Sequence, residues 1–406
     1  MIVRLWRAGQ RLWPCGAARR AHPVRFVATL GIALAILASL TLAVPRNATS
    51  AAPPGMNGAA SLSGGQRFES ANKPYAFSFP RDHAAHFGYQ SEWWYYTGHV
   101  RSKSGRRFGY ELTFFRIGLR PGDPTISAGR SAWRGNELYP AHFALTDENG
   151  KTFVHYERFA REALGAGYSS STSLDVRADS WSLHGSSPFV LRAAGGGDAI
   201  AFSLVAQKPP AVHGHAGISK KAACGTCASH YYSMTRLATR GTLVHRGEKF
   251  AIDGITWMDH EFGSDELQSN QSGWDWYSIQ LDDRRELMIY SLRQKDGSIT
   301  PQSSGSLIER DGRVTYLSRA DFVTESTGSW KSPHTGGTYP SGWRVRVARA
   351  NVDLVLAPTV LDQELANTAG GVSYWEGSVD VRDARTQRAL GVGYVELTGY
   401  AGAISL

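Results

Sequence analysis

The stretch from Phe87 to Val100, FGYQSEWWYYTGHV, constrains the fold more than any other part of the chain. Its aromatic and β-branched residues favour a β-strand. Successive side chains of a strand point to opposite faces. One face then carries Glu92, Trp94, Tyr96 and Gly98, and the other carries Trp93, Tyr95, Thr97 and His99. Because large aromatics lie on both faces, we expect both to be covered, as in a barrel strand packed inside and outside.

Tight turns separate similar apolar or alternating runs along the rest of the chain. They lie at 102–105, 147–150, 246–248, 295–297 and 310–312, and a partner strand is expected at Phe108–Phe115. Many strands joined in sequence predict up-and-down barrels or sandwiches, and the length favours two domains. We therefore predict an all-β chain of two successive antiparallel β-barrels. A short strand at Tyr75–Pro80 and a short helix at Thr152–Leu164 are also expected.

The first 52 residues predict a signal peptide. Six arginines and no acidic residue precede the apolar run from Phe26 to Val44, and small residues follow it. An uncleaved inner-membrane anchor through 26–44 remains the alternative, and either interpretation places the later residues in the periplasm or outside the cell. Residues 53–73 are expected to form a flexible linker. The net charge of +9 falls to +3 without these six arginines (9 − 6 = 3), which does not suggest nucleic-acid binding.

Two aromatic and acidic clusters lie between Thr256 and Leu281: WMDHEFG at 257–263 and GWDWY at 273–277. Aromatic walls exclude water, which raises the pKa of a carboxyl group and keeps it protonated as a proton donor. The catalytic candidates are therefore Asp259, His260, Glu261 and Asp275. The candidates for substrate contact are Trp257, Trp274, Trp276 and Tyr277, with Glu92, Trp94 and Tyr96 from the first strand. The competing interpretation is a packed core with a satisfied polar network, in which Glu92 pairs with Arg116 or Arg158.

Cys224 and Cys227 are the only cysteines beyond the N-terminal segment. Outside the cytoplasm such a pair favours a disulfide. Free or redox-active thiols remain open, as does a metal site with the nearby His213 and His215. The loop between the two cysteines is very short, so a disulfide there holds the chain only locally.

Five motifs resemble those of the AttH-like family, which belongs to the lipocalin-like superfamily that includes carotenoid 1,2-hydratase. They are SEWWYYTGH at 91–99, ASHYYS at 228–233, WMDHEFG at 257–263, GWDWY at 273–277 and GVGYVELTGY at 391–400. The resemblance implies two lipocalin-like β-barrel domains, at 74–263 and 264–406. It also implies export in bacteria, often beside an ABC-transporter permease. Members are often labelled secreted hydrolases, which names no substrate.

Two functions from different classes remain open at this stage. The first is an acid–base hydratase or hydrolase that acts on a hydrophobic small molecule, similar to carotenoid 1,2-hydratase. The second is a periplasmic carrier of lipids or other hydrophobic ligands that serves an ABC-type transporter. We expect no cofactor and no metal, because His260–Ser264 is not a His-Glu-x-x-His motif and no nucleophile elbow or phosphate loop is present. Asp259, His260 and Asp275 are predicted to share one pocket where the two barrels meet.

Overall fold

The computed structural model describes residues 67–122, 135–265, 267–368 and 371–402. The predicted signal segment and most of the predicted linker lie outside these residues. The described residues all belong to one compact unit of the chain, and the two sheets below lie within it. In the part of the chain that the structure describes, no helix is long and apolar enough to cross a membrane.

Strands dominate this unit, and every strand pair in the described residues is antiparallel. The first sheet follows the order β4-β3-β2-β1-β13-β12-β9-β8-β7-β6-β5, with β10 and β11 beside β12. Its strands are β1 (Ser91–Ser102), β2 (Arg107–Gly118), β3 (Glu137–Asp147), β4 (Thr152–Arg161), β5 (Gly167–Ser169), β6 (Asp175–Ala178), β7 (Trp181–His184), β8 (Phe189–Gly195), β9 (Asp198–Ala206), β10 (Ala211–Val212), β11 (Ser219–Lys220), β12 (Ala228–His245) and β13 (Glu248–Asp265).

The second sheet follows the order β17-β16-β15-β14-β25-β24-β22-β21-β18, with β23 beside β24, and β19 pairs with β20 separately. These strands are β14 (Gln271–Leu281), β15 (Glu286–Gln294), β16 (Ser304–Ile308), β17 (Val314–Leu317), β18 (Val323–Ser326), β19 (Ser329–Lys331), β20 (Thr338–Pro340), β21 (Trp343–Val347), β22 (Val352–Pro358), β23 (Glu364–Leu365), β24 (Tyr374–Asp383) and β25 (Ala389–Thr398). Four 3-10 turns complete the described elements: η1 (Arg81–His83), η3 (Ala163–Gly165), η4 (Arg319–Asp321) and η5 (Ala348–Ala350).

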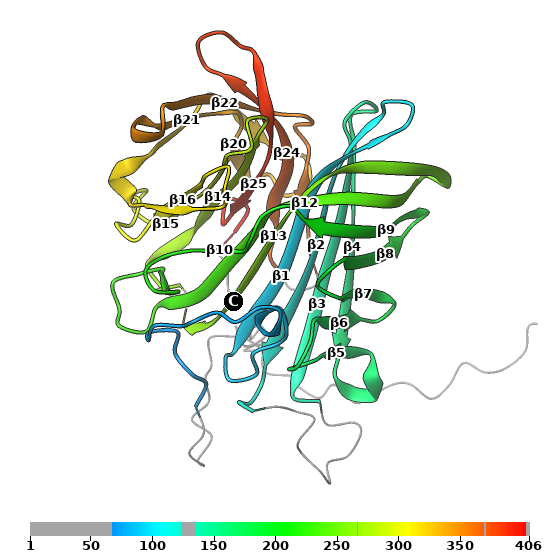
Figure 1. Cartoon of the computed structure of the whole chain (residues 1–406), viewed down its shortest axis with the longest axis vertical. Coiled ribbons are helices and arrows are strands. Elements are labelled where there is room, and N and C mark those ends of the chain that lie inside the picture. Colours follow the sequence, from blue (N-terminus) through cyan, green and yellow to red (C-terminus); the bar gives the residue numbers. More distant parts are fainter. Residues whose placement is uncertain (1–66, 123–134, 266, 369–370, 403–406) are drawn as a thin grey trace, which may run out of the picture. The chain divides into compact units, whose positions relative to one another are not determined.

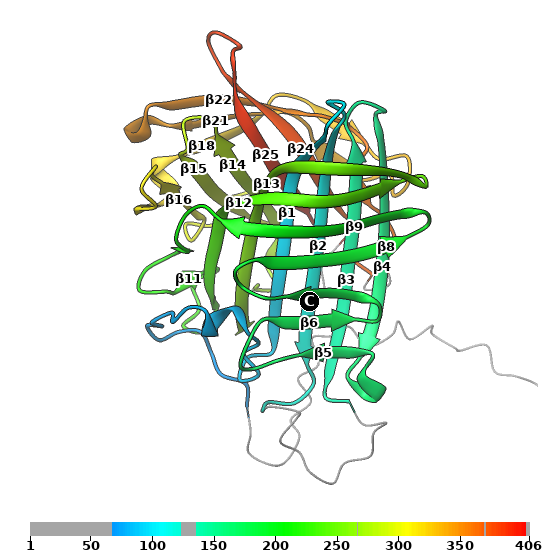
Figure 2. The same ribbon diagram turned by 45° about the vertical axis from the view of Figure 1, so that its right-hand side comes forward.

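The prediction of an all-β, lipocalin-like fold is confirmed. The first sheet curls into a nearly closed barrel, because the short strands β5 to β9 cross over the long strands β1 to β4, as Figures 1 and 2 show. The second sheet forms a half-barrel. Each sheet encloses its own apolar core. Side chains on the outer face of the first sheet pack against the second sheet in a third cluster, which contains Tyr95, Trp257 and Trp276.

Strand β1 has both faces covered, as its sequence predicts. Trp94 and Tyr96 are fully buried in the core of the first barrel. Tyr95 is buried on the other face, within the cluster between the sheets. This central strand therefore connects the barrel interior to the contact between the sheets.

Two local predictions are wrong. Residues 152–161 form strand β4, and only Ala163–Gly165 form a turn of 3-10 helix. Pairing along the whole of β3, together with the β-branched and aromatic residues of this segment, overrides its helical pattern. The segment Tyr75–Pro80 belongs to no sheet, although the Tyr75 amide donates to Ala216 O (3.0 Å).

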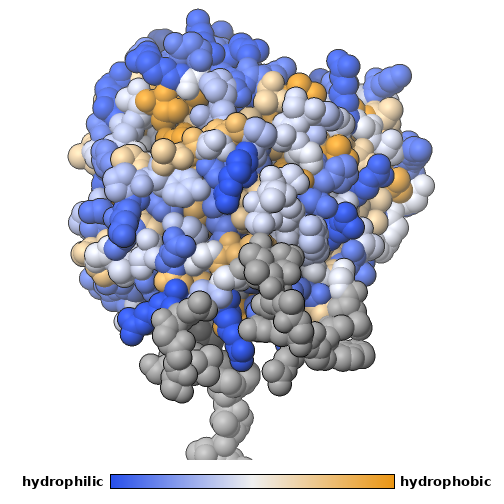
Figure 3. Space-filling model, turned by 60° about the horizontal axis from the view of Figure 1, so that its bottom comes forward, coloured by the Kyte–Doolittle hydropathy of each residue, from blue (hydrophilic) through white to orange (hydrophobic). Residues whose placement is uncertain are grey.

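Exposed apolar side chains are scattered over the surface. The large ones, Leu119, Phe159, Tyr168, Val205, Val323 and Leu361, belong to different segments. Figure 3 shows one face on which hydrophilic residues surround small apolar areas. Single exposed apolar residues of this kind are normal for a folded protein and do not mark a binding surface.

Candidate functional site

Strand alternation distributes the central stretch over three different environments. On β13, Trp257, Asp259 and Glu261 point toward the second sheet, whereas Met258, His260 and Phe262 point into the first barrel or its end. The prediction that Asp259, His260 and Asp275 share one pocket is therefore wrong. The prediction fails because side chains alternate along a strand with a period of two residues, so neighbouring side chains point to opposite faces.

His260 lies in a buried ionic network inside the first barrel. Its Nε2 is 2.8 Å from Glu92 Oε1, and its ring stacks on Trp94 with the ring centres 4.9 Å apart. His86 Nδ1 lies 2.8 Å from the same Glu92 oxygen, and Arg116 Nε donates to Glu92 Oε2 (2.8 Å). Burial alone would raise the pKa of Glu92, but Arg116, His260 and His86 hold it well below its usual range. The pairing of Glu92 with Arg116 that the sequence left open is present, whereas Arg158 pairs elsewhere, with Asp179.

His86, Glu92 and His260 form the one described group whose potential metal-ligand atoms all lie within 4.8 Å of one another. Both oxygens of Glu92 already accept hydrogen bonds from nitrogen donors, and the positive charge of Arg116 lies beside them. A cation at this position would compete with that charge and break these bonds. The group fits a structural network better than a metal site.

Asp275 and Tyr277 point into the second sheet and away from Asp259. Arg293 Nε donates to Asp275 Oδ1 (2.9 Å), and the Tyr400 hydroxyl donates to the same oxygen (3.0 Å). Tyr277 is buried in the core of the second sheet. Burial raises the pKa of Asp275, although Arg293 opposes the shift. Asp275 therefore pairs with Arg293 and Tyr400, in an environment separate from that of Asp259.

Asp259 is held between the two sheets by three hydrogen-bond donors. Trp257 Nε1 donates to Asp259 Oδ1 (2.6 Å), the Ser233 hydroxyl donates to the same oxygen, and the Tyr231 hydroxyl donates to Oδ2 (2.7 Å). Trp276 reaches across from the second sheet, where its Nε1 donates to the Tyr231 hydroxyl (3.0 Å). The contact between the sheets thus brings together Asp259, Trp257, Trp276 and Trp274, as the sequence predicts for these residues.

Three further carboxyl groups surround the same contact. Glu376 of β24 and Glu396 of β25 lie directly opposite each other in the second sheet, and Glu111 comes from β2 of the first sheet. Tyr95 of the first sheet donates its hydroxyl hydrogen to Glu376 Oε1 (2.7 Å), and Trp274 Nε1 donates to Glu396 Oε2 (3.0 Å). We call Glu111, Asp259, Glu261, Glu376 and Glu396 the carboxyl cluster.

Two oxygens of this cluster are buried without a hydrogen-bond partner among the described residues. They are Glu111 Oε2 and Glu376 Oε2, one from each sheet. The other oxygen of each group is held by a hydroxyl donor, from Thr113 for Glu111 and from Tyr95 for Glu376. Burying an unpaired polar atom is costly. Because two such atoms lie at one contact among aromatic side chains, this contact is the candidate functional site.

Burial and mutual repulsion raise the pKa of four members of this cluster, Glu111, Asp259, Glu376 and Glu396. Burial raises the pKa of Glu111 and Glu376 well above the usual range, and other carboxylates of the cluster add to both shifts. Burial also raises the pKa of Asp259 to about 7, against the effect of its three donors, and the pKa of Glu396 to about 7. Burial therefore favours the protonated form of Glu111 and Glu376, while Asp259 and Glu396, with pKa values of about 7, lie close to half-ionisation at neutral pH.

Glu261, the remaining catalytic candidate, is the cluster member with a cationic partner. Lys221 Nζ lies 2.5 Å from Glu261 Oε1, and the Ser229 hydroxyl donates to the same oxygen. Hydroxyl and indole groups donate hydrogen bonds to the other four members, Glu111, Asp259, Glu376 and Glu396. Glu396, Trp93 and Trp274 are partly exposed, so one side of the cluster reaches solvent.

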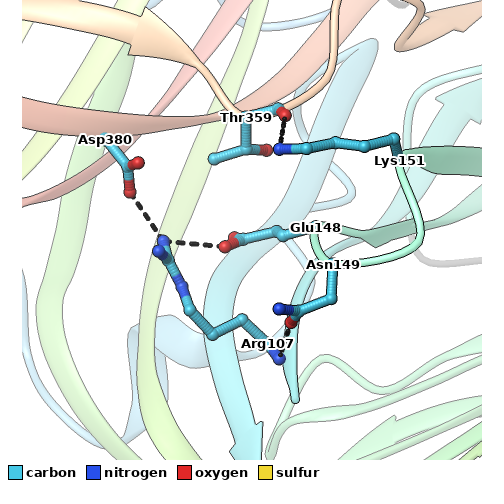
Figure 4. Close-up of a pocket in the computed structure, with 6 residues that line it drawn as sticks. All are labelled: Arg107, Glu148, Asn149, Lys151, Thr359 and Asp380. Atoms are coloured by element: carbon cyan, nitrogen blue, oxygen red, sulfur yellow. Dashed lines mark hydrogen bonds and ion pairs between the residues drawn. The ribbon is translucent and has the colours of Figure 1, made fainter. Parts of the chain in front are cut away.

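A separate polar pocket of about 230 Å³ lies between the two sheets near the β3–β4 turn. In Figure 4, Arg107 Nη2 bridges Glu148 (2.7 Å) and Asp380 (2.6 Å), while Lys151 Nζ donates to Thr359 O (2.9 Å). Arg107 pairs with Arg101 on β1, six residues from Tyr95, so this pocket lies roughly 20 Å along the strand from Asp259. Its charged groups bind one another, which suits a contact between the sheets better than acid–base chemistry.

Sequence reasoning missed Glu111, Glu376 and Glu396 as members of the site. Each is an acid that follows directly on large aromatic or apolar side chains, in GYEL, YWEG and YVEL, and such an acid is the signal that could have found them. Their common location was hidden, because they come from strands that only the packing of the two sheets brings together.

His142 is a packed histidine: its Nδ1 lies 2.7 Å from the Tyr374 hydroxyl across the same contact.

Cys224 and Cys227 are joined by a disulfide in the loop between β11 and β12, with their Cα atoms 5.4 Å apart. His213 is not beside them as a ligand. Its two ring nitrogens lie 2.8 Å from Ser306 Oγ and 2.6 Å from Ser233 Oγ, and burial lowers its pKa to about 3. His215 packs its ring against Tyr316.

Replacing both cysteines by serine should cost no more than about 2 kcal/mol in the free energy of unfolding, because so short a loop restricts the unfolded chain little. Denaturant titration of the double variant beside the parent protein measures this cost. A loss of about 5 kcal/mol would contradict the prediction and would show that the loop supports the whole fold.

Comparison with known proteins adds three findings. A family model described as AttH-like matches residues 70–400. The structure of a protein assigned as AttH from Nitrosomonas europaea is 30% identical, covers 80% of this chain and 98% of its own, and superposes with a TM-score of 0.71. Kievitone hydratase from Nectria haematococca is 16% identical, with 83% and 97% coverage and a TM-score of 0.59, a likeness that shows the fold. No curated protein matches the chain.

Proposed function

The chain belongs to the AttH-like family, and we propose that it is an acid–base enzyme that adds water to a carbon–carbon double bond of a hydrophobic small molecule. The observation that carries this proposal is the pair of buried, protonated carboxyl groups, Glu111 and Glu376, each with one oxygen that lacks a partner. A structural relative, kievitone hydratase, is named for a hydration. Its likeness is consistent with this chemistry, but the argument rests on the carboxyl groups.

Glu376 is assigned as the proton donor. Tyr95 orients it through one oxygen, which leaves the O–H of the other oxygen available to a substrate. The proton forms a C–H bond with the π electrons of the alkene, and a carbocation remains on the second carbon. The aromatic faces of Trp257, Trp274 and Trp276 border the cluster and stabilise a positive charge.

Asp259 is assigned as the base. With a pKa near 7 and three donors that favour its ionised form, it accepts a proton from the water that attacks the carbocation. Transfer of that proton from Asp259 back to Glu376 restores the starting state. The net reaction is alkene plus water to alcohol, and it needs no redox partner.

The proposed function includes a location outside the cytoplasm. The arginine-rich start and the apolar run at 26–44 support a location in the periplasm, outside the cell or at the inner membrane. The substrate would then be a hydrophobic compound met outside the cytoplasm. Fractionation of cells that express the full chain tests this part, and uncleaved soluble protein in the cytoplasm would contradict it.

Incubation of the protein with a panel of isoprenoid and polyene alkenes in ¹⁸O-labelled water tests the activity. We expect one panel member to gain the mass of one labelled water, at a rate that depends on the protein. Cleavage products that carry the label would assign a hydrolase instead. A panel compound that binds tightly and is recovered unchanged, with the same affinity after Glu376→Gln, would contradict the enzyme and favour the carrier that serves a membrane transporter.

A further inference from the structure

Lys221 reaches the carboxyl cluster from a loop that bridges the two sheets. Its amide donates to Cys227 O (2.9 Å) across the disulfide-closed turn, and its carbonyl accepts a hydrogen bond from Gln271 Nε2 (2.9 Å) at the start of β14. The preceding carbonyl, of Lys220, accepts a hydrogen bond from the Tyr290 hydroxyl (3.2 Å) on β15. The backbone of Lys221 is therefore anchored to both sheets.

The ammonium group of Lys221 is almost completely buried, with a side-chain exposure of 9%. It lies 4.5 Å from the ring centre of Tyr290 and 5.2 Å from that of Tyr231, in addition to the ion pair with Glu261. Two aromatic faces and one carboxylate form a site that suits a cation. A buried ammonium group is stable only when it is paired, and Glu261 is the carboxyl group that pairs with Lys221.

We propose that Lys221 is a positioning residue, which holds the negative charge of the carboxyl cluster on Glu261 and thereby reserves Asp259 for proton transfer. The inference rests on the proposed function, in which Asp259 is the base. Asp259 and Glu261 lie on the same face of β13, two residues apart, so each senses the charge of the other. Burial is the main cause of the raised pKa of Asp259, and the neighbouring Glu261 carboxylate adds to it.

Removal of the Lys221 cation is expected to move the negative charge from Glu261 to Asp259. Without the Lys221 cation, Glu261 keeps the hydrogen bond from Ser229. Asp259 has three donors, Ser233, Tyr231 and Trp257. A carboxylate with more donors ionises first. In Lys221→Met, we therefore expect Glu261 to take up a proton at neutral pH and Asp259 to release one.

Other titratable groups that face Asp259 and Lys221 also influence where the negative charge lies. Asp259 also faces Glu376 and Glu396 from the second sheet, whose raised pKa values keep them largely protonated below neutral pH. Lys221 faces Tyr231 and Tyr290, and its charge is one of the causes that keep His213 neutral. Burial raises the pKa of Tyr231 well above its usual range, and the exchange is expected between Asp259 and Glu261.

Carbon-13 NMR of the side-chain carboxyl carbons measures the exchange without any substrate. Protein labelled on aspartate alone is titrated from pH 4 to pH 9, and Asp259 is assigned by loss of its signal in Asp259→Asn. We expect Lys221→Met to lower the titration midpoint of Asp259 by at least one pH unit, a tenfold change in proton affinity. Lys221→Arg, which keeps the positive charge, should restore most of the parent midpoint.

Two further variants make the test decisive. Lys220→Met removes an exposed cation from the adjacent residue and should leave the Asp259 midpoint unchanged. Glu261→Gln removes the neighbouring charge while retaining Lys221, so it should lower the midpoint even if Lys221→Met fails to fold. An Asp259 midpoint in Glu261→Gln equal to that of the parent would overturn the proposal. The NMR titration of Asp259 needs no substrate and can be read whether or not any alkene is hydrated. Failure of the activity assay and failure of this inference are therefore distinguishable.

Discussion

Glu376→Gln is expected to abolish hydration, with a loss in kcat of about 10²- to 10⁴-fold, the usual contribution of a general acid. Glutamine keeps the shape of the side chain and can accept the hydrogen bond from Tyr95, but it has no acidic proton to donate. Folding should be preserved, because the replacement removes a group that is neutral at neutral pH. Initial rates with the alkene identified in ¹⁸O-labelled water provide the measurement.

Asp253→Asn is the matched control for this variant. Asp253 is exposed on β13, so its replacement removes a carboxyl group without touching the cluster and should leave turnover unchanged. Glu376→Gln with parental kcat would remove Glu376 from the donor role, and Glu111, the other carboxyl group with a partnerless oxygen, would take its place. Full activity in both Glu376→Gln and Glu111→Gln would defeat the proposed acid chemistry.

Arg116→Met is expected to have the largest effect on stability, about 3–5 kcal/mol in the free energy of unfolding, because it leaves buried charge without a partner. Arg116, Glu92 and Glu137 have no exposed side-chain surface. The guanidinium group of Arg116 donates to both carboxylates, at 2.8 and 2.9 Å, and to the carbonyl oxygens of His86 and Tyr89. Chemical denaturation followed by tryptophan fluorescence measures the loss.

Two further variants test whether the loss of stability in Arg116→Met comes from the buried ionic network. Arg101→Met replaces an exposed arginine of the neighbouring strand β1 and should change the unfolding free energy by less than about 0.5 kcal/mol. Arg116→Lys keeps the charge but not the planar set of donors, so an intermediate loss is expected. If Arg116→Met unfolds at the same denaturant concentration as Arg101→Met, the buried network does not stabilise the first barrel.

The all-β fold could be predicted from the sequence because its signals are local. Alternation of side chains along β1 and the short turns depend only on neighbouring residues, and the burial of both faces follows from the aromatics that each face carries. The same local reasoning predicted a helix at Thr152–Leu164. There it was wrong, because pairing with β3 is a long-range interaction that no local pattern contains.

The candidate site was only partly predictable, for the same physical reason. The aromatic and acidic residues at 257–277 mark the right region, and Asp259 with Trp257 and Trp276 do lie together. Side-chain direction, however, alternates every residue, so His260 and Asp275 share the motif but not the site. Linear proximity in a strand is therefore a poor guide to a common pocket.

The sequence by itself determined the class of fold, the family and the kind of chemistry that carboxyl groups among aromatics can perform. Only the tertiary structure decided which carboxyl groups meet. Glu111, Asp259 and Glu376 come from β2, β13 and β24, and they meet only because the outer face of one sheet packs against the other. Their raised pKa values follow from that contact, since the exclusion of water and the repulsion between like charges depend on distances in space rather than along the chain.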